Sequence, residues 1–201
     1  MGVFQQPIFV LCDPAVLRTL PPREVASGVA ELVKTAAIGN PRLFEDIESD
    51  PERVLSLERG FILGAVRDAL RFKASVVEAD EKEGGERRQL NFGHTVGHAV
   101  EAVTGMSHGE AVSVGMAFAA ELSVRKRYLG PDECRRIRAL LERLGLPVTA
   151  DAPREAVFDA VLKDKKRGRE SVRFVFLEGI GRPLVREIPL TELESAVHDL
   201  C

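Results

Sequence analysis

The sequence predicts a mainly α-helical fold with a short N-terminal strand and one small β-hairpin near residues 172–188. Three observations favour this class. Apolar residues recur every three or four positions over most of the chain. Proline, glycine and capping residues divide that pattern into helices of ordinary length. Only two short regions have the brief apolar run or the alternation that is typical of strands.

The first half of the chain is predicted to hold one strand and two long helices. Residues 7–13 form a brief apolar run bounded by proline and aspartate, which is typical of a buried strand. The Pro-Pro pair at 21–22 opens a helix, since proline is well accommodated there, and the Gly-Asn-Pro run at 39–41 closes it. A second long helix follows Pro51 and ends in the charged, glycine-containing run 80–88.

The second half is predicted to be helical around the hairpin. The Asn-Phe-Gly turn at 91–93 leads into a short helix, and Ser107 with Glu110 forms a capping box that starts the next one. That helix runs to Arg127. Further helices are expected at 132–144, 154–163 and 189–200, and the hairpin strands at 172–177 and 184–188.

Composition excludes several classes of protein. The 201 residues, 45% hydrophobic and 29% charged, fit one globular domain, or one with a small appendage. A net charge of −3 gives no basic surface for nucleic acid. No signal peptide or membrane-spanning run is present, so we expect no membrane partner. The widely spaced Cys12, Cys134 and Cys201 fit neither a disulfide framework nor a zinc knuckle, which favours the reducing cytoplasm.

Three of the four histidines lie within residues 94–108. His94 and His98 are four residues apart and share one face of a helix, and a short loop can bring His108 back toward them. Three imidazoles, or two with a carboxylate, would form an open zinc-type site. Helix-end histidines without a ligand are the alternative, and the crowding favours a site. His198 is distant in sequence and is expected to have no role.

Charged residues elsewhere could belong to a functional site or could form only ordinary ion pairs. Glu31 lies in an apolar helix, where it has either a specific partner or only an ion pair with Lys34 three residues later. Glu83 and Arg87, taken alone, fit an exposed salt bridge. Four cations could form a pocket for a phosphate or carboxylate if they converge on the histidines: Lys73, Arg87, Lys165 and Lys166.

Several motifs in register resemble 3-dehydroquinate synthase over residues 1 to about 181. They are Gly-Val-Phe-Gln-Gln-Pro (2–7), Thr-Leu-Pro-Pro-Arg-Glu (19–24), Gly-Val-Ala-Glu-Leu-Val-Lys (28–34), Asp-Glu-Lys-Glu-Gly-Gly-Glu-Arg (80–87), Leu-Asn-Phe-Gly-His-Thr-Val-Gly-His-Ala-Val-Glu (90–101), His-Gly-Glu-Ala-Val (108–112) and Asp-Lys-Lys (164–166). The resemblance implies that residues 1–201 form the family's helical C-terminal metal and substrate domain. The NAD-binding α/β domain would be absent from this chain, which also has no Gly-x-Gly-x-x-Gly fingerprint after a strand.

The same resemblance implies a role for each matching residue. Glu31, His94 and His108 would be metal ligands, His98 would transfer protons and contact phosphate, and Glu83 would be the second acid/base group. Substrate contacts would come from Lys34, Lys73, Arg87, Asn91 and one of Lys165 or Lys166. Contacts to NAD would come from Leu17, Thr19 and Ser27.

The activity implied is a carbon–oxygen lyase reaction that converts the keto-acid phosphate DAHP to 3-dehydroquinate and releases phosphate, within the shikimate route to chorismate and the aromatic amino acids. Zn²⁺ (or Co²⁺) and NAD⁺ would be the cofactors. We expect no turnover by the chain alone, and either a homodimer or association with an N-terminal domain. The alternatives are another sugar-phosphate cyclase, a metal-dependent polyol dehydrogenase, and a non-catalytic zinc-binding helical module. The run 80–87 argues against the dehydrogenase, whose alcohol carries no phosphate.

Overall fold

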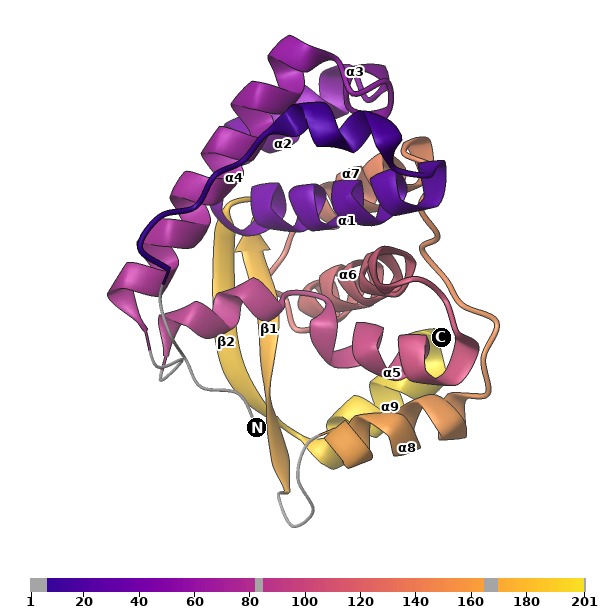
Figure 1. Cartoon of the computed structure of the whole chain (residues 1–201). Coiled ribbons are helices and arrows are strands. Elements are labelled where there is room, and N and C mark those ends of the chain that lie inside the picture. The colour runs from indigo at the N-terminus through magenta and orange to yellow at the C-terminus, as the bar shows by residue number, and fades with distance from the viewer. Residues whose placement is uncertain (1–6, 82–84, 165–169, 201) are drawn as a thin grey trace.

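The helix α6 (His108–Arg125) lies at the centre of the fold, as the computed structural model shows (Figure 1). The structure describes residues 7–81, 85–164 and 170–200. The surrounding elements are η1 (Pro14–Thr19), α1 (Pro22–Gly39), α2 (Pro41–Ser49), α3 (Glu52–Leu55), α4 (Arg59–Ala79), η2 (Glu86–Asn91), α5 (His94–Thr104), α7 (Pro131–Arg143), α8 (Arg154–Asp164), β1 (Ser171–Gly179), β2 (Arg182–Pro189) and α9 (Leu190–Leu200).

Helix α6 is central because its sequence is apolar or small on every side. Its middle, residues 111–120, is buried throughout, and a helix that is apolar all round is stable only when other elements surround it. It packs against α1 and α5 on the side of the histidines, and against α7 and β1 elsewhere. The capping box predicted for its start is confirmed, since Ser107 and Glu110 bond reciprocally.

The expected N-terminal strand at residues 7–13 is wrong. These residues form no strand in the structure, and the four apolar side chains 8–11 are 68–101% exposed. A strand needs a neighbouring strand to satisfy its backbone, and the only sheet in the described residues is the two-stranded hairpin β1–β2. The apolar run therefore has the composition of a buried strand but pairs with no strand among the described residues.

Residues 41–79 form three helices, α2, α3 and α4, where the sequence predicted one long helix after Pro51. We expected Gly39-Asn40-Pro41 only to close a helix, but the Asn40 side chain accepts a hydrogen bond from the Leu43 N–H and also opens α2. The long helix expected after Pro51 is two helices, α3 and α4. The break lies at Leu57, whose φ of 53° is left-handed.

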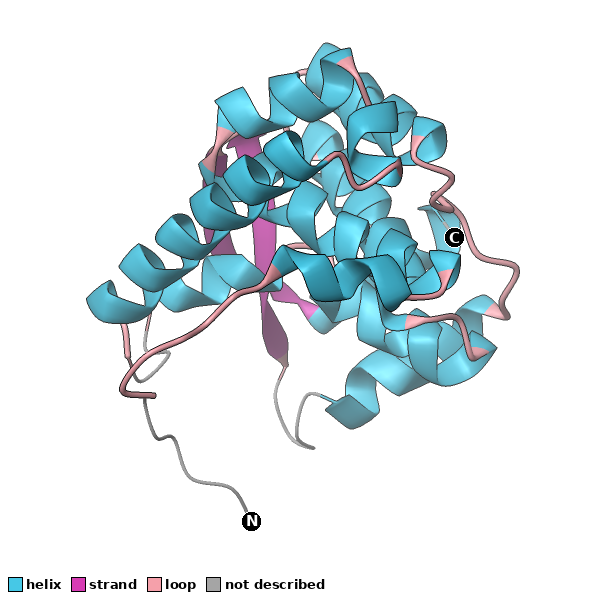
Figure 2. Ribbon diagram, turned by 45° about the horizontal axis from the view of Figure 1, so that its top comes forward, coloured by secondary structure: helices cyan, strands magenta, loops and turns pink. Residues whose placement is uncertain are grey.

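The predicted hairpin is confirmed and is anchored to the helices. β1 and β2 pair antiparallel from Ser171↔Pro189 to Gly179↔Arg182, and they stand behind the helices in Figure 2. The buried Ser123 hydroxyl on α6 accepts a hydrogen bond from the Leu177 N–H at 3.1 Å. At the turn, the Gly181 N–H donates to the carbonyl of Ala37 on α1 at 2.7 Å. The predicted helices at 132–144, 154–163 and 189–200 are also present.

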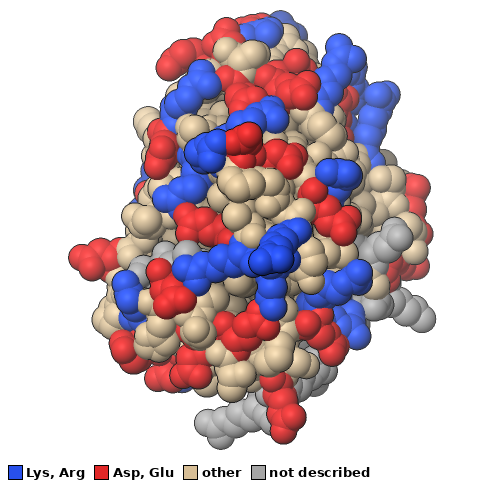
Figure 3. Space-filling model, turned by 180° about the vertical axis from the view of Figure 1, so that it is seen from behind, with Lys and Arg blue, Asp and Glu red and all other residues tan. Residues whose placement is uncertain are grey.

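Lysine, arginine, aspartate and glutamate side chains alternate over the face seen from behind (Figure 3), and no continuous basic stripe marks that face. Within the described ranges, no helix has both the length and the apolar character that a bilayer crossing requires.

Candidate metal and active site

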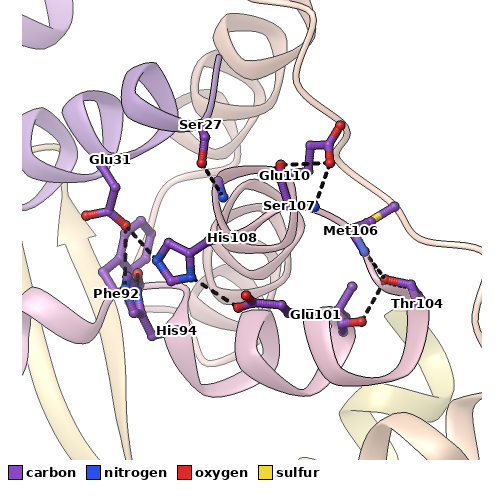
Figure 4. Close-up of polar contacts among 12 residues, drawn as sticks. Ser27, Glu31, Phe92, His94, Glu101, Thr104, Met106, Ser107, His108 and Glu110 are labelled. Atoms are coloured by element: carbon purple, nitrogen blue, oxygen red, sulfur yellow. Dashed lines mark hydrogen bonds and ion pairs between the residues drawn. The ribbon is translucent and has the colours of Figure 1, made fainter. Parts of the chain in front are cut away.

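One carboxylate oxygen and two imidazole nitrogens converge between α1, α5 and α6 (Figure 4). The Oε1 atom of Glu31 lies 3.5 Å from Nε2 of His94 and 3.5 Å from Nε2 of His108. Ligand atoms of these three residues all lie within 4.8 Å of one another, and they form the only such group found in the described part of the chain. Residues separated by up to 77 positions in sequence thus meet at one point.

Close approaches between helices create this convergence. A Cβ added at Gly109 would lie 2.2 Å from Cα of Ser27, so α1 and α6 meet there almost backbone to backbone. A Cβ at Gly115 would lie 1.9 Å from the carbonyl oxygen of Gly93, which brings the start of α5 equally close to α6. Small residues at these crossings let the side chains of Glu31, His94 and His108 approach one another.

Polar contacts reinforce the crossing of α1 and α6. The Gly109 N–H donates to the Ser27 hydroxyl at 2.9 Å. Arg23, on the first turn of α1, donates to the Glu110 carboxylate at 2.9 Å. Because Glu110 also receives hydrogen bonds from Ser107, the pKa of its carboxyl is lowered to about 2, first by Arg23 and then by Ser107.

Burial and charge set the protonation of the site. Lys34 is only 6% exposed, and its Nζ lies 2.7 Å from Oε2 of Glu31. Burial raises the pKa of the Glu31 carboxyl, but the Lys34 ammonium and the two histidines outweigh it, so the net pKa is lowered. Burial, followed by Lys34, lowers the pKa of His94 to about 4. At neutral pH the site therefore presents a carboxylate and a neutral imidazole.

This arrangement fits a divalent metal. Oε1 of Glu31 is buried and has no hydrogen-bond partner, although buried polar atoms are normally satisfied. Nδ1 of His94 lies 3.2 Å from the Phe92 carbonyl, and Nδ1 of His108 lies 3.1 Å from Oε2 of Glu101. With a proton on each Nδ1, both Nε2 lone pairs face the orphaned oxygen. One oxygen and two nitrogen ligands with room for others suit zinc or cobalt.

His98 lies beside this group without belonging to it. Its ring centroid is 5.1 Å from that of His94 and 5.9 Å from that of His108, and its side chain is exposed. The sequence left open a three-histidine site or two histidines with a carboxylate. The structure brings together the second set and leaves His98 at the edge.

The expected substrate contacts are distributed over three elements. Lys73 on α4 and Glu31 line one cavity of about 330 Å³ between α1, α4 and η1. Arg87 on η2 donates its backbone N–H to Asp80 and its guanidinium to the Glu81 carbonyl. Asn91 ends η2, which packs against both α1 and α4. Glu83, Lys165 and Lys166 lie outside the described residues.

Of the residues expected to contact NAD, Leu17 and Thr19 lie on η1, and Ser27 lies on α1. Leu17 lines the cavity that Lys73 also lines, and the Thr19 hydroxyl donates to the Val16 carbonyl at 2.9 Å. Ser27 holds Gly109, as described above. Neither Glu101 nor Arg23 was predicted from the sequence to have a role. Glu101 could have been suspected from its position seven residues after His94, on one face of α5.

A family model described as 3-dehydroquinate synthase C-terminal matches residues 28–167. The chain belongs to this family. It is 42% identical to a 3-dehydroquinate synthase of Arthrobacter sp. (strain FB24) over 201 aligned positions, covering 98% of this chain and 55% of that protein. A 3-dehydroquinate synthase of Thermoanaerobacter pseudethanolicus is 39% identical over 197 positions, covering 96% and 55%.

Solved structures share the 3-dehydroquinate synthase C-terminal fold. A 2-epi-5-epi-valiolone synthase from Streptomyces hygroscopicus subsp. jinggangensis 5008, with NAD⁺ and Zn²⁺ bound, matches at a TM-score of 0.80 and 26% identity, covering 94% of this chain and 54% of that chain. A 2-deoxy-scyllo-inosose synthase complexed with carbaglucose-6-phosphate, NAD⁺ and Co²⁺ matches at a TM-score of 0.76 and 24% identity, covering 94% and 56%. The chain thus spans about half the length of the relatives that it matches.

Proposed function

We propose that this chain is the metal- and substrate-binding half of a 3-dehydroquinate synthase, which converts DAHP to 3-dehydroquinate with release of phosphate. The observation that carries the proposal is the convergence of Glu31 Oε1 with the Nε2 atoms of His94 and His108. Identity of about 40% to proteins named 3-dehydroquinate synthase supports this reaction over those of the cyclases with similar folds.

Glu31, His94 and His108 would hold the metal, Zn²⁺ or Co²⁺. When bound, such an ion supplies Lewis-acid polarisation of a substrate hydroxyl or carbonyl oxygen. Lys34 engages Oε2 of Glu31 at 2.7 Å, which leaves Oε1 directed at the two imidazoles. The near-complete burial of Lys34 keeps this ammonium in place beside the site.

His98 would carry protons at this site. Its exposed imidazole lies next to both histidine ligands and is free to face a substrate, and an imidazole can accept and return a proton near neutral pH. Glu83 would be the second acid/base group. Lys34, Lys73, Arg87, Asn91 and one of Lys165 or Lys166 would bind the substrate's phosphate and carboxylate, because cationic and amide donors match anionic oxygens.

NAD⁺, which accepts and returns hydride, would be bound mostly by a partner segment that corresponds to the remaining part of the relatives. Leu17, Thr19 and Ser27 would contact it from this chain. We therefore propose that turnover requires association with such a segment. The exposed apolar run 8–11 supports this association, because it has the composition of a strand and pairs with no strand among the described residues.

The test is reconstitution. The chain is mixed with the remaining segment of the Arthrobacter relative, NAD⁺ and Zn²⁺, and phosphate release from DAHP is measured. We expect activity in the mixture, none with either part alone, a loss of at least about 100-fold for His98→Ala, and full activity for the control His198→Ala on α9. A metal-loaded complex that releases no phosphate would support the non-catalytic module instead. A panel of sugar phosphates separates the other cyclases.

A further inference from the structure

The two histidines of the proposed metal site are oriented by different groups. Nδ1 of His94 faces a backbone carbonyl two residues earlier, that of Phe92, at 3.2 Å. Nδ1 of His108 faces the side-chain carboxylate of Glu101 at 3.1 Å. A backbone carbonyl is fixed by the turn itself, whereas a carboxylate is contributed by one particular residue. Figure 4 shows this carboxylate reaching from α5 to the ring on α6.

Glu101 has no other polar side-chain contact among the described residues. The His108 ring is its one ion-pair or hydrogen-bond partner there, and its side chain is 39% exposed. The residue lies in the last turn of α5, where a negative charge opposes the helix dipole. Helix stability therefore does not account for a glutamate at this position.

We infer that Glu101 is a positioning residue that orients His108 and strengthens it as a metal ligand. This inference rests on the metal site proposed above. A proton held on Nδ1 by the carboxylate places the lone pair on Nε2, which is the atom that faces Glu31 Oε1. A carboxylate behind a ligating imidazole fixes its tautomer and rotation and increases its basicity.

The position of His108 makes this support necessary. His108 is the first residue of α6 and follows a tight connection through Gly105, whose φ is 69°. Its side chain is 42% exposed, compared with 14% for His94, so packing constrains its ring much less. The bond from α5 supplies the constraint that burial gives to His94.

The test measures metal affinity by competition titration of the full chain with Zn²⁺, and the visible spectrum of its Co²⁺ form. Loss of such a supporting carboxylate typically weakens metal binding by about 10- to 100-fold, and we expect that loss for Glu101→Ala. Glu101→Gln keeps an oxygen that accepts a hydrogen bond from the Nδ1–H group but removes the charge, so we expect partial rescue and a shifted Co²⁺ band. Glu142→Ala, which removes an exposed carboxylate on α7, is the control and should change neither reading.

Glu31→Gln distinguishes this inference from the proposed function. If Glu31→Gln abolishes metal binding while Glu101→Ala leaves the affinity within twofold of the unmodified chain (about 0.4 kcal/mol), the role of Glu101 is overturned and the metal site stands. If both variants bind metal as the unmodified chain does, the metal binds elsewhere and both proposals fail. Unchanged thermal melting of metal-free Glu101→Ala would show that the loss of affinity is not a loss of fold.

Discussion

Ser27 on α1 and Gly109 on α6 lie against each other, 82 residues apart in sequence. The Gly109 N–H donates to the Ser27 hydroxyl at 2.9 Å, and no side chain fits between them. Glu31 lies one turn after Ser27, and His108 directly precedes Gly109. This crossing therefore sets the distance between two residues of the proposed metal site.

Replacing Gly109 with alanine tests this crossing. A Cβ there would meet the Ser27 backbone, which cannot move aside as a flexible side chain can. We expect a loss of about 1–3 kcal/mol in the free energy of unfolding, measured by urea denaturation, together with weaker Zn²⁺ binding. Gly64→Ala on α4 is the matched control, since nothing lies within 4 Å of its added Cβ. That variant should gain about 0.5–1 kcal/mol as a helical glycine replaced by alanine; equal losses in both would argue against the crossing.

The buried Lys34 predicts the result of changing Glu31 in the metal-free chain. Glu31→Gln removes the anion 2.7 Å from an ammonium that is only 6% exposed. An ammonium left without its partner should lower the free energy of unfolding by about 1–3 kcal/mol. Chemical denaturation without metal measures this loss. Lys126→Gln, which breaks the more exposed pair with Glu192, should cost less than about 1 kcal/mol.

Metal addition should stabilise the unmodified chain. A ligand that binds only the folded state raises stability by about 2.7 kcal/mol when its free concentration is 100 times its dissociation constant. We expect Zn²⁺ and Co²⁺ to raise the thermal midpoint, and a chelator to reverse the change. In Glu31→Gln the midpoint should not respond, whereas in His198→Ala it should respond as in the unmodified chain. A response in Glu31→Gln would place the bound metal elsewhere.

The Arg23–Glu110 ion pair predicts that the free energy of unfolding depends on pH in the acidic range. The folded-state pKa of Glu110 is about 2, below its ordinary value of 4.5. Its contribution to stability is therefore complete above pH 4.5 and is lost as the pH falls toward 2. Glu110→Gln keeps the capping box but loses the charge. The stability of the unmodified chain should exceed that of the variant at pH 7, with the difference shrinking between pH 4.5 and 2; a constant difference would contradict the prediction.

Substitutions in the exposed apolar run at residues 8–11 are expected to weaken association with the remaining segment without changing the stability of this chain. These side chains are largely exposed, so replacing Phe9 and Leu11 with serine should change the stability of the chain by less than about 0.5 kcal/mol. Binding to the remaining segment of a relative, measured by calorimetry, should weaken if the run pairs with that segment. Serine replacing the exposed Leu63 on α4 is the control. Unchanged binding would remove the run from the interface.

Local sequence determined most of the helices. The capping box at Ser107 and Glu110, the Pro-Pro start of α1 and the alternation in β1 are local signals, and the structure contains each element. Local signals were misleading where one residue serves two elements, as Asn40 does, or where φ departs from the helical value, as at Leu57. The run 7–13 has the pattern of a strand, yet forming one depends on a partner outside the run.

The candidate metal site shows the same distinction between what local sequence predicts and what tertiary contacts decide. The residues pointed to a metal centre of histidines, because three histidines within one short segment are unusual, and the resemblance indicated Glu31 as a ligand. Only the tertiary structure placed Oε1 of Glu31 between two Nε2 atoms and put Glu101 behind His108. Helical periodicity fixes which side chains share a face of one helix. The distance between side chains on different helices depends on close packing at contacts such as Ser27 with Gly109, which join residues far apart in the chain.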